Sequence, residues 1–172
     1  MCTDATPLPG RKHPLRWIPD VYAEWRTPIS VNVKLKPGRA LDLTELAPLV
    51  VAVLLDRAKR FGFELNAYCV MPTHFHFVCS VERQEADSAA FLGMLKSEIC
   101  RRARKEGLPR FAWQRSFWDR HTREEEDVRA AIQYVLDNPV RKGLCESWEE
   151  WRWSAFLCWP YAGEGASDQV AG

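Results

Sequence analysis

The chain has 172 residues, with 24 Lys and Arg against 23 Asp and Glu, which gives a formal net charge of +1. This length predicts one domain that can bury a hydrophobic core without disulfides, and the near-neutral charge makes no case by itself for binding nucleic acid. The six cysteines form no C-x-x-C pair, which argues against a zinc ribbon or redox motif, and without a signal core or membrane span we expect a cytoplasmic protein.

The N-terminal part of the chain predicts an arm, a strand and a helix. Residues 1–28 contain five prolines and no hydrophobic periodicity, which is typical of an extended arm. Apolar residues alternate in 29–35, and this period of two predicts a strand. Between Leu46 and Phe61 the apolar residues recur every three or four positions, so we expect an amphipathic helix that begins near Thr44 and is capped by it.

The remaining elements are predicted from the same two patterns, alternation for strands and recurrence every three or four residues for helices. Alternation in 65–71 and in 74–81, separated by a Pro-Thr turn, predicts an antiparallel hairpin. Helical spacing predicts a helix over 88–105 and another over 124–138, and a short strand is expected within 111–121.

This order of elements predicts an α+β fold of the ferredoxin-like, split βαβ type: one antiparallel sheet with helices on one face. We expect the domain to cover residues 29–145. Residues 146–172 form a tryptophan-rich extension that should pack back on the domain and end in a disordered tail.

Two histidines stand close together in the second strand of the hairpin. Because side chains alternate along a strand, His74 and His76 point to one face and Phe75 and Phe77 to the other. Two neutral imidazoles on one face can bind a single divalent ion, but they do not complete a site. A histidine-triad nucleotide hydrolase would need a third alternating histidine, and the sequence has Val78 there.

A tyrosine and an asparagine share one edge of the helix predicted over 124–138. At about 100 degrees per residue, Tyr134 lies off the apolar stripe, and Asn138, one turn later, projects from nearly the same edge. If this helix crosses the sheet face that carries His74 and His76, the edge supplies a nucleophile and a third metal ligand together.

Four separated blocks of the sequence resemble the REP-associated tyrosine transposases, which belong to the single-tyrosine HUH transposase superfamily. The resemblance spans about residues 29–156 and rests on His74-Phe75-His76, on 113–123, on 134–144 and on 153–156. It implies a DNA transposase in which Tyr134 attacks a backbone phosphate of single-stranded DNA and leaves a 5′-phosphotyrosine. It also implies that His74, His76 and Asn138 hold Mg²⁺ or Mn²⁺.

The expected partner is single-stranded DNA, in particular a strand that forms a hairpin. The basic face of the helix over 88–105 and the segment after it offer candidate phosphate-binding residues, which are Arg101, Arg102, Arg104, Arg115 and Arg120. The long C-terminal extension favours a monomer over a homodimer. Two alternatives stay open, because a catalytically silent DNA-binding regulator or a protein with a purely structural metal site would carry the same residues.

Overall fold

The computed structural model describes residues 11–13, 28–38, 41–83, 86–108, 111–114, 117–121 and 125–160, and the statements below concern these residues. The strands are β1 (Arg11–His13), β2 (Pro28–Lys34), β3 (Phe63–Met71), β4 (His74–Val81), β5 (Phe117–His121) and β6 (Ser154–Phe156). The helices are η1 (Leu43–Leu46), α2 (Ala47–Arg60), α3 (Ser88–Lys105), α4 (Glu125–Leu136), α5 (Asn138–Arg141) and η2 (Trp148–Glu150).

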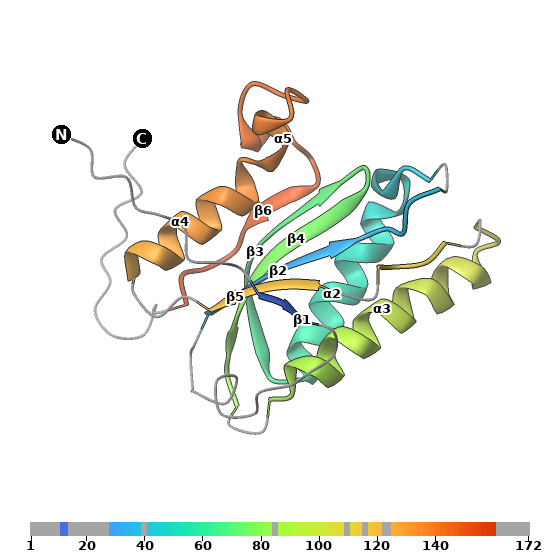
Figure 1. Cartoon of the computed structure of the whole chain (residues 1–172), viewed down its shortest axis with the longest axis horizontal. Helices are drawn as coiled ribbons and strands as arrows, with labels where there is room; N and C mark the ends of the chain where they lie inside the picture. The colour runs from blue at the N-terminus through green and yellow to red at the C-terminus, as the bar shows by residue number, and fades with distance from the viewer. Residues whose placement is uncertain are drawn as a thin grey trace.

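All the strands belong to one antiparallel sheet with the order β1-β5-β2-β4-β3-β6 (Figure 1). The central order β5-β2-β4-β3 is that of a split βαβ fold, because β4 lies between β2 and β3, the two strands that α2 connects. The predicted α+β class is therefore confirmed. The two edge strands are additions that the sequence did not predict, since β1 lies in the proline-rich arm and β6 in the C-terminal extension.

The helices lie on both faces of the sheet, which corrects the expectation that they share one face. Helices α2 and α3 pack against the face formed by β2 residues such as Val31 and β4 residues such as Phe75 and Phe77. Helix α4 covers the opposite face through an apolar stripe that includes Val128 and Ile132, and Figure 1 shows it across the sheet from α2 and α3. This second core is small, and it borders the strand face that carries the two histidines.

A β-bulge at Asn66 changes which side chains of β3 face each core. The β3 to β4 register shifts between Leu65 and Ala67, so the strict alternation expected for 65–71 does not hold. Leu65 packs in the core under α2 and α3, whereas Ala67 and Cys69 pack under α4. The extra residue of a bulge reverses the facing of every later side chain in the strand, and this is the physical reason for the difference.

Local hydrogen bonds fix the ends of the helices. Asp42, rather than Thr44, caps the first helical turn, because its carboxylate accepts from the Thr44 backbone N–H at 2.8 Å. Helix α4 ends at Leu136, two residues earlier than predicted, and Asn138 and Pro139 open the short helix α5. The start of the predicted helix at residue 124 lies outside the described residues.

The C-terminal extension packs on the sheet as expected. The Trp151 indole N–H donates to the Val70 carbonyl at 2.9 Å, and the Val70 N–H donates to the Trp153 carbonyl at 2.9 Å. These bonds hold β6 at the β3 edge of the sheet. The predicted disordered tail falls in 161–172, outside the described residues. No helix within the described ranges is long and apolar enough to cross a membrane.

Candidate active site

The site begins with the histidine pair at the start of β4. The imidazole rings of His74 and His76 lie 4.6 Å apart, centroid to centroid, at an interplanar angle of 83°. His76 is only 4% exposed, and His74 is partly buried. The Thr73 hydroxyl is hydrogen-bonded to His74 Nδ1 at 3.0 Å, which leaves Nε2 as the nitrogen available to a ligand.

The surroundings keep both imidazoles uncharged. Burial, followed by the positive charges of Lys34 and Lys142, lowers the pKa of His74 to about 4. Burial, followed by His74 and Lys34, lowers the pKa of His76 to about 3. At neutral pH both rings therefore carry a free lone pair, which is the form of histidine that binds a metal ion.

Two strand neighbours flank His76 on its own face of the sheet. Asn32 of β2 and Cys69 of β3 are its direct cross-strand partners. The Asn32 Oδ1 atom is buried and has no hydrogen-bond partner. Burial raises the pKa of the Cys69 thiol to about 11, so Cys69 stays a neutral thiol and is a poor metal ligand. His76 thus lies beside a buried acceptor that lacks a donor.

Helix α4 brings Tyr134 to this face. The centre of the Tyr134 ring lies 6.0 Å from the centre of the His76 ring, with the two planes at 86°. The tyrosine is 47% exposed, so it lies off the buried stripe of α4, as the helical spacing predicts. The Arg141 guanidinium carbon is 4.6 Å from the centre of the same ring. The helix edge and the histidines therefore meet within one chain.

Asn138 lies at the junction of α4 and α5 and is 6% exposed. Its side-chain Nδ2 donates to the carbonyls of Tyr134 at 2.7 Å and Val135 at 3.4 Å. Pro139 has no N–H to continue the helix, and the Asn138 amide supplies the missing donor. Because the amide nitrogen is used in this way, the Oδ1 oxygen is the atom left for a ligand.

A carboxylate-rich or thiolate-rich metal centre is absent from the described part of the chain. No group of three or more His, Cys, Asp or Glu side chains converges there. The metal site predicted from the sequence uses an amide as its third ligand, so it stays a prediction.

Three of the arginines predicted to bind DNA lie on α3, on the other side of the sheet from the histidines. Arg101 and Arg102 lie on α3, across the sheet, and both donate to the Glu98 carboxylate, with bonds of 2.6 to 2.8 Å. Arg104 donates to the Cys100 carbonyl on the same helix. Arg115 and the side chain of Arg120 lie outside the described residues, so their predicted role stays a prediction too.

Three cations near the histidine pair were missed by the sequence analysis. Lys34 is the cross-strand partner of His74, and Arg141 and Lys142 follow Asn138 at the end of α5. Alternation along the predicted strand placed Lys34 on the same face as Asn32, and this was the only sequence signal for Lys34. Strand pairing, which the sequence does not reveal, was needed to place it beside a histidine.

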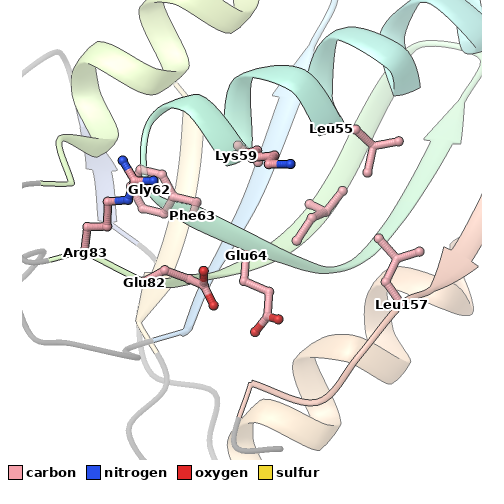
Figure 2. A pocket seen from close by; sticks show the side chains of 10 residues that line it. Leu55, Lys59, Gly62, Phe63, Glu64, Glu82, Arg83 and Leu157 are labelled. Carbon is pink, nitrogen blue, oxygen red and sulfur yellow. The ribbon is translucent and has the colours of Figure 1, made fainter.

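A pocket of about 460 Å³ lies elsewhere, at the end of the β3–β4 hairpin farthest from His74. Figure 2 shows Lys59, Glu64 and Glu82 around it. Glu64 is paired with Ser80, near the opposite end of β4 from the histidines. The pocket is therefore separate from the histidine and tyrosine cluster, and its mixed charges select no single class of ligand.

The family of the chain follows from its match to a family model for IS200-like transposases over residues 42–138, more than half of its length. The chain belongs to the IS200-like transposase family. Within that class it resembles the REP-associated tyrosine transposases, so the resemblance seen in the sequence is confirmed.

The relatives and the solved structure agree with one another. The chain is 24% identical to the REP-associated tyrosine transposase of Escherichia coli over 125 residues, 73% of each protein. It is 27% identical over 112 residues to a Haemophilus influenzae protein assigned to the same group, covering 57% of this chain and 61% of that protein, less than two thirds of its length. A structure of a REP-associated tyrosine transposase bound to a REP hairpin matches with a TM-score of 0.66 and 24% identity, over 77% of this chain and 78% of that chain.

Proposed function

We propose that the protein is a DNA transposase that cleaves and rejoins single-stranded DNA through a 5′-phosphotyrosine on Tyr134, with a divalent metal ion at His74, His76 and Asn138. The observation that carries the proposal is the exposed Tyr134 ring, 6.0 Å from the buried and uncharged His76. A half-exposed phenol beside a pair of neutral imidazoles provides a nucleophile next to a metal-binding face.

The reaction is a balanced exchange of phosphodiester bonds. The phenolic oxygen of Tyr134 loses its proton and attacks the phosphorus, and the bond from phosphorus to the 3′ oxygen breaks. The departing oxygen takes a proton and becomes a free 3′-hydroxyl. Attack by a 3′-hydroxyl on the phosphotyrosine reverses the step and rejoins the strand. Because the covalent link conserves the phosphodiester, no nucleotide triphosphate is consumed.

The residues present fit a divalent ion. Two neutral imidazoles and one amide oxygen suit Mn²⁺ better than Mg²⁺, which prefers oxygen ligands. When bound, such an ion would act as a Lewis acid on the phosphate. Ligating histidines usually donate their second ring N–H to a nearby acceptor. Asn32 Oδ1, buried and without a donor, is the acceptor beside His76.

Single-stranded DNA that folds into a hairpin is the substrate we propose, since the matched relative of known structure is bound to a REP hairpin. We also propose that the tyrosine acts in cis and that the protein works as a monomer. The contact between Tyr134 and His76 within one chain supports this arrangement, because no second copy is needed to bring the nucleophile to the metal ligands.

The test uses the full chain, a labelled hairpin oligonucleotide with single-stranded flanks, and Mn²⁺. We expect a covalent protein–DNA adduct on a denaturing gel, and we expect it to vanish in Tyr134→Phe. Tyr68→Phe is the matched control, because Tyr68 packs on the α2 and α3 side of the sheet, and it should keep the adduct. If the wild-type protein binds the hairpin but forms no adduct, the chain is the silent DNA-binding regulator instead.

A further inference from the structure

Three cations stand around the candidate active site. Lys34 ends β2 and pairs across the strands with His74, so both side chains lie on the same face of the sheet. Arg141 ends α5, and Lys142 follows it. Both ammonium groups, Lys34 and Lys142, act on His74 strongly enough to lower its pKa, in addition to the effect of burial. We refer to Lys34, Arg141 and Lys142 as the rim cations.

The rim cations have no carboxylate partner among the residues that the structure describes. The ion pairs seen there all involve Asp56 of α2 or Glu98 of α3, and they neutralise arginines on the far side of the sheet. Glu98 alone binds Arg57, Arg101 and Arg102. Within the described ranges Arg104 and Lys105 of α3 also lack a carboxylate, so the rim cations differ from them by lying beside the histidine and tyrosine cluster.

Arg141 differs from the two lysines in its contact with the nucleophile. Its guanidinium carbon lies 4.6 Å from the centre of the Tyr134 ring, while the His76 ring approaches that ring at 86°. The ring therefore has both a cation and an imidazole as neighbours. A guanidinium is planar, so it can stack on an aromatic ring and still direct N–H groups at a phosphate from its edge, which an ammonium cannot do.

On the basis of the proposed strand cleavage, we propose that the rim cations form the clamp that binds the backbone phosphates of the single strand at the cut site, and that Arg141 also positions Tyr134. Lys34 and Lys142 hold the strand on the histidine side of the rim. Arg141 binds a phosphate through its free N–H groups while its stacked face fixes the tyrosine ring. Helix α3 is not part of this clamp.

The binding test is made in the Tyr134→Phe background with EDTA, so that neither cleavage nor a metal ion contributes. The dissociation constant for the hairpin oligonucleotide is measured from 50 to 300 mM salt for Lys34→Gln and Arg141→Gln, with Arg104→Gln on α3 as the charge-matched control. We expect each rim variant to weaken binding by about 3- to 10-fold at low salt and to reduce the slope of log K against log salt by about 1. Arg104→Gln should leave both quantities unchanged.

The positioning role has its own variant. Arg141→Lys in the Tyr134 protein keeps the charge and loses the planar stack, so we expect hairpin binding within about twofold of wild type but adduct formation slower by about 10-fold or more. Adduct formation at the wild-type rate would overturn this role. Melting temperatures of all variants, compared with their parents, check that they fold.

Other outcomes separate the two proposals. The clamp is overturned if Arg104→Gln loses as much hairpin affinity as the rim variants, or more. It is also overturned if the rim variants keep the affinity of their parent. Both results count even if the wild-type protein forms its adduct. Weaker binding by the rim variants together with no wild-type adduct supports the clamp and overturns strand cleavage.

Discussion

The two faces of the sheet use the same kinds of residue in opposite ways. On the face under α2 and α3, apolar rings fill the core and several charges above it are paired, as when Glu98 binds three arginines. On the face under α4, the core is small, and its border carries neutral histidines, an acceptor without a donor at Asn32, and cations without carboxylates in the described ranges.

The difference teaches that residue type alone does not mark a binding surface. A buried or partly buried polar group is costly unless it is satisfied, so unsatisfied groups gathered in one place indicate a ligand that completes them. On the α3 side, ion pairs inside the protein neutralise the arginines around Glu98 and Asp56, although Asp56 Oδ2 and Arg57 Nε accept or donate no hydrogen bond among the described residues. On the site side, the proposed ion and phosphate would complete the groups that lack a partner.

Phe77 and His76 are adjacent residues of β4 that face opposite sides of the sheet, and they give the strongest test of the contrast between the two faces. Phe77 is fully buried between Phe75 and Phe91, so Phe77→Ala should lower the free energy of unfolding by about 3–5 kcal/mol, measured by urea denaturation. His76→Ala should cost clearly less stability and should abolish Mn²⁺ binding in calorimetry. Equal destabilisation by the two variants with metal binding retained in His76→Ala would contradict the division into a packing face and a binding face.

The Glu98 network should be stabilising and pH-dependent. Hydrogen bonds from Arg101 and Arg102 hold the pKa of Glu98 well below its usual value of about 4.3. Its contribution to stability is therefore present above pH 4.3 and is lost as the pH falls further.

We expect Glu98→Gln to lower the melting temperature at pH 7 by about 3–8 °C, a moderate value because Arg101 and Arg102 are half exposed. The difference in melting temperature between Glu98→Gln and the wild-type protein should become smaller as the pH falls from 4.3 to 3. A gap that stays constant through this range would show that the carboxylate charge is not the cause.

Asn32 tests whether its unpaired oxygen supports the metal ligand. Asn32→Leu removes the acceptor beside His76, and loss of such a partner should weaken Mn²⁺ binding by about 10-fold, measured by calorimetry. The melting temperature should hardly change, because the buried oxygen has no bond to lose. Unchanged Mn²⁺ affinity would show that Asn32 does not hold the His76 ring.

The smallest effect is expected at an exposed ion pair on the helix side. Arg60 and Asp56 are 2.8 Å apart, one helical turn from each other, and the Arg60 side chain is largely exposed. Arg60→Gln should change the free energy of unfolding by less than about 0.5 kcal/mol, because solvent screens such pairs. A loss as large as that of Glu98→Gln would mean that burial does not distinguish the two networks.

The sequence was sufficient for most of the helices and strands and for the facing of side chains that have local signals. The alternation around His74 and His76 placed both on one face, and the helical count placed Tyr134 off the apolar stripe, which the structure confirms. What it missed depends on pairing between distant segments. The bulge at Asn66, the register that puts Lys34 beside His74, and the added strand β6 have no short-range signature.

The pairing of charges on α3 was also out of reach of the sequence, and the DNA-binding role predicted for its arginines stays a prediction. The basic helix α3 looked free because its partner, Glu98, occupies the same helix and also reaches Arg57 on α2. Arginines in a sequence look equally available, and only packing shows which of them a carboxylate already holds. Glu98 on the same turn as Arg101 and Arg102 was the one local clue.

Position 138 carries an amide, although a carboxylate would attract a cation more strongly. The hydrogen bonds of the Asn138 side chain give the reason. Its nitrogen bridges two main-chain oxygens where a proline interrupts the helix. An Asn138→Asp exchange would turn an acidic oxygen toward those two carbonyls, and the resulting repulsion would push apart the turn that carries Tyr134, the proposed nucleophile. These hydrogen bonds thus restrict which side chain position 138 can carry, and any displacement of that side chain is transmitted to the main chain of Tyr134.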